Sequence, residues 1–168
     1  MMKHLVWIVL VIAMLCAFAG CSAQTASQQP TQNVAIGNPW SDWASLKEAE
    51  HAVGYELNVP ESVGETYAAV RYRTMAGAMT LLEVVYSDGT HEVTVRKTEG
   101  EGEDISGVYG HDTTEIKAWN GVSVIYGRAA EGDSLKITFD YGGYSWSLYA
   151  RDGISEGALD SFLTAMLG

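Results

Sequence analysis

Cysteine is one of the scarcest residue types in this chain of 168 residues. Only Cys16 and Cys21 are present, and both lie within the first 21 positions. A disulfide or a zinc site built on thiolates is therefore excluded for the remainder of the chain. Its fold must depend on an apolar core, and 47% of all residues are apolar, which is enough to build one.

Several catalytic motifs are also absent. The sequence contains no Gly-x-Ser-x-Gly, which places a nucleophilic serine on a sharp turn, and no His-Glu-x-x-His, which binds zinc on a helix. Beyond the N-terminal region the only histidines are His51, His91 and His111, and their spacing does not set two of them on one helix or strand face. We therefore expect no catalytic residue, no metal site and no cofactor.

Positive charge is scarce as well. The chain has 10 Lys and Arg residues against 21 Asp and Glu residues, a formal net charge of −11. Such a surface repels nucleic acid, so we expect no nucleic-acid partner.

The densest acidic run is 99–104, Glu-Gly-Glu-Gly-Glu-Asp. A solvated acidic loop is the simpler interpretation, and a calcium site is the alternative, although the EF-hand order of ligands is absent.

The first 21 residues have the layout of a bacterial secretion signal. Lys3 supplies positive charge, an apolar run extends from Leu5 to Phe18, and the small residues Ala19 and Gly20 precede Cys21. The run is shorter than the roughly 20 apolar residues that a spanning helix needs. The sequence Phe-Ala-Gly-Cys at 18–21 resembles the lipobox of bacterial lipoproteins, with phenylalanine where that family usually has leucine.

This resemblance implies cleavage between Gly20 and Cys21 and lipidation of Cys21. Two acyl chains would hold the protein stably on a membrane, whereas one chain binds only marginally. We therefore expect residues 1–20 to be a signal peptide and the mature protein to be anchored to the cell membrane, facing outside the cytoplasm. An ordinary secreted protein and a membrane-spanning anchor are the alternatives.

A polar segment separates this signal from the folded part. Residues 21–38 contain few large apolar side chains and have nothing to bury, so they predict a flexible tether. A coil of this length reaches about 20–25 Å. Residues 39–168 then form a single domain, held close to the membrane.

Two amphipathic helices are predicted, one near each end of this domain. The first follows Ser45, which forms a capping-box pattern with Glu48, and it ends at Gly54. The second follows Ser155. The apolar face of the second helix consists of Leu159, Phe162, Leu163 and Met166.

Between the helices, apolar and polar residues alternate, which is typical of strands with one buried and one wet face. The alternating segments are 67–73, 82–86, 92–96, 115–118, 122–126, 135–141 and 144–149. Asp88-Gly89, Asn120-Gly121 and Gly142-Gly143 are two-residue hairpin signals. We predict an α+β fold, an antiparallel meander of about seven strands with both helices packed on one face.

The alternation also assigns aromatic and basic side chains to the two faces of the sheet. The aromatic residues expected in the core are Phe139, Tyr141, Tyr144 and Trp146. Those expected on the outward face are Tyr67, Trp119 and Tyr149, among Arg71, Arg73, Arg96, Lys117 and Lys136. An exposed face of this kind can bind a glycan, a peptide or a protein. The candidate binding residues are Trp119, Tyr149, Tyr67, Arg71 and Arg73, unless a helix or loop covers them.

Four segments carry a resemblance to a known kind of domain. They are Gly54–Glu61 after the first helix, Leu82–Gly89, the Asn120-Gly121 hairpin, and Gly143–Leu148 before the closing helix. Together they resemble a small domain of unknown function found in bacterial envelope lipoproteins and in the extracytoplasmic parts of some anti-sigma-factor proteins. The resemblance covers about Trp40 to Leu167 and implies no catalytic residue.

These observations favour a non-enzymatic, membrane-anchored protein that binds or senses a ligand outside the cytoplasm. The expected partners are the membrane, through Cys21, and an envelope protein or a glycan. One alternative is a regulatory partner of an envelope membrane protein or an anti-sigma system. A hydrolase acting on cell-envelope polymers is the other, and a deep pocket joining His91 or His111 to carboxylates would favour it.

Overall fold

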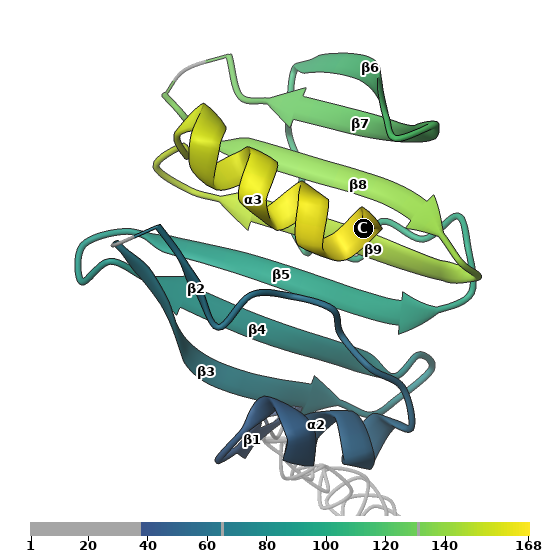
Figure 1. The fold of residues 1–168 in the computed structure, drawn as a ribbon. Coiled ribbons are helices and arrows are strands. Elements are labelled where there is room, and N and C mark those ends of the chain that lie inside the picture. The colour runs from purple at the N-terminus through teal and green to yellow at the C-terminus, as the bar shows by residue number, and fades with distance from the viewer. Residues whose placement is uncertain (1–37, 65, 131) are drawn as a thin grey trace, which may run out of the picture. The chain divides into compact units, whose positions relative to one another are not determined.

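Nine antiparallel strands form one sheet, and two helices pack on one of its faces (Figure 1). The computed structural model describes residues 38–64, 66–130 and 132–168. The elements are β1 (Trp40–Trp43), α2 (Leu46–Val53), β2 (Ser62–Val63), β3 (Tyr67–Met75), β4 (Leu81–Ser87), β5 (Glu92–Glu99), β6 (Thr113–Trp119), β7 (Val122–Arg128), β8 (Leu135–Tyr141), β9 (Tyr144–Ala150) and α3 (Glu156–Leu167). The predicted α+β class is confirmed, and β1 and β2 are additions to the seven predicted strands. The predicted signal peptide, the lipidation site Cys21 and the tether up to residue 37 lie outside the described residues.

The strand order shows that the sheet is two meanders and not one. The order is β1-β3-β4-β5-β9-β8-β7-β6, with β2 also paired to β3. After β5 the chain does not turn back at once. Residues 100–112, here called the connecting segment, carry it to the far edge, where β6 begins, and β7, β8 and β9 then return to pair with β5 (Figure 1). The prediction of a single meander was wrong at this point.

The core lies on the inner face of the sheet, the face that α2 and α3 cover. One continuous apolar cluster joins Ala49 of α2, strand residues such as Val84 and Leu148, and Phe162 of α3. The ring of Phe162 meets the ring of Tyr86 edge-on, with 4.8 Å between the centroids. Both helices therefore bury their apolar stripes against the same face, as predicted.

The ends of α2 follow the predicted capping pattern. The Ser45 hydroxyl accepts a hydrogen bond from the backbone N–H of Glu48. The Glu48 carboxylate reaches back and accepts from the backbone N–H of Ala44, one residue before the expected partner. Gly54 ends the helix with φ of 85°, a left-handed conformation that glycine adopts without strain.

A β-bulge in β3 changes which of its residues face the core. The register with β4 shifts between Ala69 and Arg71. An extra residue at a bulge reverses the inward and outward assignment on one side of it. Tyr67 and Tyr72 consequently both pack against the core although they are five residues apart, and Val70 is exposed. The predicted outward position of Tyr67 was therefore wrong.

Two predictions at hairpin ends also need correction. Ser87 pairs with Glu92, so the loop containing Asp88-Gly89 has four residues and not two. Tyr141 was assigned to the core, but it is 42% exposed because it is the last residue of β8, beside the turn at 142–143.

No helix in the described ranges is long and apolar enough to cross a membrane.

Candidate functional site

The outer face of the sheet, opposite α2 and α3, carries a buried ion cluster. Arg73, Glu83 and Arg96 lie directly opposite one another on β3, β4 and β5. The Nε atom of Arg73 donates to Oε1 of Glu83 at 2.7 Å, and the Nε atom of Arg96 donates to Oε2 at 2.8 Å. Glu83 is fully buried, although its alternating position predicts a solvated side chain. Because each carboxylate oxygen faces its own guanidinium, the buried charge is compensated.

Trp40 of β1 covers this ion cluster. Its ring centroid lies 4.7 Å from the guanidinium carbon of Arg73 and 5.4 Å from that of Arg96. Both distances are typical of cation–π contacts. The indole also shields part of the ion cluster from water, which strengthens the Coulomb attraction between its charges. Arg73, a predicted binding residue, is thus engaged within the protein.

Two cationic side chains hold the connecting segment on the outer face. Arg96 Nη1 donates to the backbone carbonyls of Ile105 at 2.9 Å and Ser106 at 2.6 Å. Lys136 of β8 donates to the Asp104 carboxylate at 2.9 Å. The ion cluster therefore does more than neutralise Glu83, because Arg96 also fixes the connecting segment, whose pairing with a strand among the described residues is limited to a single bridge between Gly100 and Tyr144.

A cavity of about 320 Å³ lies between the connecting segment and strands β7 and β8. Its volume is at the lower end of the range found for small-molecule sites. The polar side chains that line it are Glu103, Asp104, His111, Thr114, Lys136, Thr138 and Asp140. We call it the His111 cavity, and titratable side chains from the connecting segment and β8 converge on it.

His111 has the most unusual environment in this cavity. Its ring meets Tyr149 edge-on, with 6.3 Å between the centroids, and lies so close to Gly127 that a Cβ there would come within 3.2 Å of the His111 Cβ. Both ring nitrogens are buried, and neither has a hydrogen-bond partner among the described residues. Buried polar atoms are normally paired, so an unpaired imidazole is a candidate ligand contact.

The charge state of His111 follows from the same surroundings. Burial lowers the pKa of His111 below its usual value, and the positive charge of Lys136 lowers it further. The imidazole is therefore neutral at pH 7. A neutral ring offers one donor nitrogen and one acceptor nitrogen.

The acidic run 99–104 is tied to the hairpin of β8 and β9. Asp140 accepts from the backbone N–H of Gly102 at 3.1 Å, and the Glu101 carboxylate accepts from the N–H of Gly143 at 3.2 Å. Asp104 accepts from the Ser106 hydroxyl at 2.6 Å in addition to Lys136. Within the part of the chain that the structure describes, no group of three or more metal-ligating side chains converges. All residues of 99–104 are exposed, which agrees with the predicted solvated acidic run, and these hydrogen bonds fasten the run to the hairpin.

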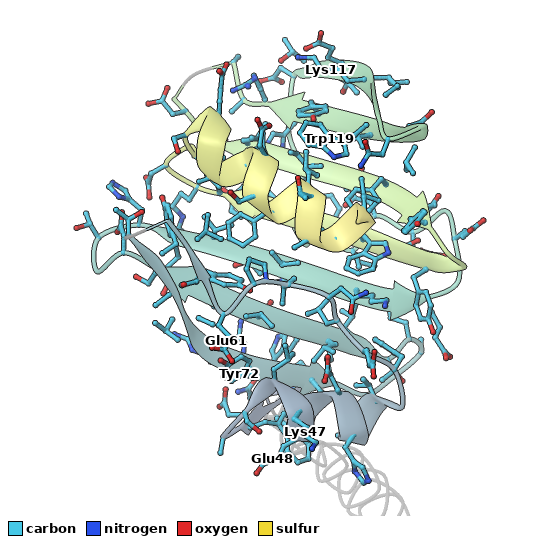
Figure 2. The ribbon with its side chains drawn as sticks, viewed as in Figure 1. Lys47, Glu48, Glu61, Tyr72, Lys117 and Trp119 are labelled. Atoms are coloured by element: carbon cyan, nitrogen blue, oxygen red, sulfur yellow. The ribbon has the colours of Figure 1, made fainter. Side chains whose placement is uncertain are left out.

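The five predicted binding residues do not share one surface. Tyr149 and Arg71 are on the outer face, where Tyr149 packs on His111 and Arg71 lies 3.9 Å from Glu92. Trp119 lies on the inner face, because its neighbour Lys117 is paired with the core residue Val124. Figure 2 shows Trp119 and Lys117 on the side of the sheet that carries α3.

The outward assignment of Trp119 and Lys117 was wrong, because these alternate residues of β6 face the core and the residues between them face outward. Ile116, the apolar neighbour of Lys117 in the alternating segment 115–118, is 67% exposed. The indole packs against the core, and its Nε1 atom is buried without a partner among the described residues. Tyr67 is buried as well, so a shared aromatic and basic binding face is not formed.

His91 and His111 differ in the direction of their pKa shifts. The Asp88 carboxylate lies 3.0 Å from His91 and raises the pKa of that histidine, while the pKa of Asp88 falls to about 2. A raised pKa gives His91 a stabilising contribution that is full below about pH 6.5 and is lost as pH rises through the folded value. The lowered pKa of His111 gives a contribution that is full above about pH 6.5 and is lost as pH falls.

An NMR titration of the imidazole resonances should therefore give a midpoint above about 6.5 for His91 and below it for His111. In urea unfolding, the loss of stability between pH 7 and pH 5 should be smaller in His111→Gln than in the wild type and larger in His91→Gln. Equal midpoints for the two rings would contradict the environment described for His111.

Comparison with known proteins gives no match: no family model fits the chain, and no curated protein or solved structure resembles it. The resemblance to envelope lipoproteins stays a prediction.

Proposed function

We propose that this protein is a lipid-anchored extracytoplasmic protein whose domain binds a small, neutral, polar ligand in the His111 cavity and catalyses no reaction. The ligand class that fits best is a saccharide. The anchor is the one implied by the lipobox-like sequence at 18–21. The tether would keep the binding domain within a few nanometres of the membrane, so the ligand would be met at the cell surface.

The unpaired imidazole of His111 is the observation that carries this proposal. A neutral imidazole can accept from one group and donate to another, which matches the hydroxyl and N-acetyl groups of a sugar. Thr114 and Thr138 bring further hydroxyl groups to the same cavity. A site with few polar groups at fixed positions is typical of small-molecule recognition.

The charges of the cavity favour a neutral ligand over an ion. Lys136, the cation that lines it, is already paired with Asp104 at 2.9 Å. The net charge of −11 repels anions over the whole surface. A neutral ligand avoids this repulsion and the cost of separating the Lys136 pair.

The test is calorimetric titration of the full chain in detergent with glucose, N-acetylglucosamine and their short oligomers. We expect at least one member of this series to bind the wild type and to bind His111→Ala at least about tenfold more weakly, because the ring lines the cavity and its nitrogens have no partner among the described residues. His91→Ala is the matched control, since it removes a histidine outside the cavity, and its affinity should equal that of the wild type. Equal binding by both variants, or no binding by the whole series, would refute the proposal.

A hydrolase is the second candidate, because the cavity joins His111 to the carboxylates of Asp104 and Asp140. A histidine near carboxylates can act as a general base on a bound water. Binding is preferred, because both carboxylates already accept hydrogen bonds within the protein and no described serine or cysteine lines the cavity. Chromatography of the same oligomers after long incubation distinguishes the two, since only a hydrolase would shorten them.

A further inference from the structure

Strand β6 is an open edge of the sheet. Among the described strands it pairs with β7 alone, and the register between the two strands is continuous over seven residues, without a bulge. Six of its seven residues are exposed. Natural proteins commonly protect an edge by shortening, bulging or covering it, or by placing charged side chains on it. β6 carries the charges of Glu115 and Lys117, but its backbone is long, regular and uncovered among the described residues, so it can act as a template for a strand whose charges are complementary.

The backbone of β6 is oriented for such pairing. Asn120 and Gly121 have φ of 48° and 84°, the signature of a two-residue hairpin turn of the type I′ class. In that turn the flanking residues Trp119 and Val122 form a hydrogen-bonded pair, and hydrogen-bonded and open pairs then alternate along the ladder. Ile116 falls at an open pair, so its N–H and C=O point away from β7, toward the free edge.

The sequence of β6 is complementary to itself when two copies run antiparallel. With Ile116 opposite Ile116 of a second copy, Glu115 faces Lys117 and Lys117 faces Glu115. Opposite charges placed directly across two strands stabilise their pairing. In the single chain these two side chains already lie 3.1 Å apart, so the paired strands would join four alternating charges.

The same register also brings exposed apolar side chains together. Ile116 and Ile125 are directly opposite on β6 and β7, and they are 67% and 39% exposed. Pairing at Ile116 would place four isoleucines, two from each copy, in one stripe across the outer face. Removing this apolar surface from water adds a driving force that backbone hydrogen bonds alone do not supply.

We propose that the chain forms a two-fold symmetric dimer in which β6 pairs antiparallel with β6 of a second copy, centred on Ile116. A two-fold interface requires a patch that is complementary to itself, which β6 is. Thr114 and Ile125 also line the His111 cavity, so two such cavities would lie on either side of the seam. The dimer does not depend on whether that cavity binds a ligand.

Cysteine cross-linking of the full chain, with Cys16 and Cys21 replaced by serine so that no other thiol reacts, tests the register. In Ile116→Cys the two new cysteines would have Cα atoms about 5.5 Å apart, within the range for a disulfide. In Ala118→Cys, the matched control, they would be at least about 13 Å apart and cannot be joined. We expect oxidation to give a covalent dimer for Ile116→Cys and for the double variant Thr114→Cys with Ala118→Cys, but not for Ala118→Cys alone. No dimer with Ile116→Cys, or an equal yield with Ala118→Cys, would overturn the proposal.

Charge exchange gives an independent readout. Lys117→Glu and Glu115→Lys should each weaken dimerisation of the full chain in detergent by about tenfold or more, because like charges then face each other at both symmetric positions. An equimolar mixture of the two variants should regain the wild-type affinity in sedimentation equilibrium, since unlike charges face again. A mixture that associates no better than the separate variants would overturn the proposed pairing.

Discussion

Glu83→Gln should lower the free energy of unfolding by about 3 kcal/mol or more. The substitution keeps the side-chain volume but removes the negative charge that Arg73 and Arg96 share. Two guanidinium groups would then face each other beneath Trp40 without a counter-ion. Their side chains are 22% and 18% exposed, so water relieves part of the repulsion and the loss falls at the lower end of the range for broken buried ion pairs. Urea unfolding followed by tryptophan fluorescence measures this loss.

Glu92→Gln is the matched control for this variant. It removes the same group from an ion pair with Arg71 that spans 3.9 Å and whose side chains are 58% and 45% exposed. Exposed pairs of this kind contribute less than about 1 kcal/mol. Similar losses for Glu83→Gln and Glu92→Gln would contradict the role assigned to the ion cluster.

Phe162→Ala should cost about 3–5 kcal/mol, because it empties the centre of the contact between α3 and the sheet. The ring is fully buried and packs edge-on against Tyr86. The loss combines the transfer of an aromatic side chain out of water with the cavity that remains. The same urea unfolding experiment measures this loss. The slope of the unfolding free energy against urea concentration should be unchanged if the fold is retained.

Thr164→Ala, an exposed position on the same helix, serves as the control for Phe162→Ala and should change stability by no more than about 0.5 kcal/mol. If Phe162→Ala were equally mild, α3 would not be covering the core. The two variants together thus separate the packing of the helix from its intrinsic stability.

Elements controlled by short-range signals could be predicted from the sequence. Ser45 and Ser155 cap the two helices as expected, and each hydroxyl accepts from the backbone three residues on. Both glycines of the 142–143 turn have positive φ, as a primed hairpin turn requires. Such signals act within a few residues, so neither the order of the strands nor their distant partners is needed to recognise them.

The path of the chain between β5 and β6 could not be predicted in this way. Hairpin signals fix only neighbouring strands, and none is present in the connecting segment. The bulge between Ala69 and Arg71 has no clear signal either, yet it turns Tyr67 toward the core. In β6, where six residues are exposed, alternation indicates which residues share a face and not which face is covered.

The candidate site shows the same division between local and long-range information. Arg73, Glu83 and Arg96 all fall on the outward phase of their strands, so their pairing agrees with the alternation in the sequence. Their burial depends on Trp40 and on the connecting segment, which reach the outer face from positions far away in the chain. His111 is likewise buried by segments that no periodicity links to it.

The proposed location at the cell surface depends on Cys21 carrying the membrane anchor. Mass spectrometry of the mature chain, purified from bacteria that express the whole sequence, tests this directly. We expect a chain that begins at Cys21 and carries two or more acyl chains, and a Cys21→Ser variant that is neither cleaved at Gly20 nor acylated. A mature wild-type chain that still begins at Met1, or that lacks any acyl group, would contradict the proposed function.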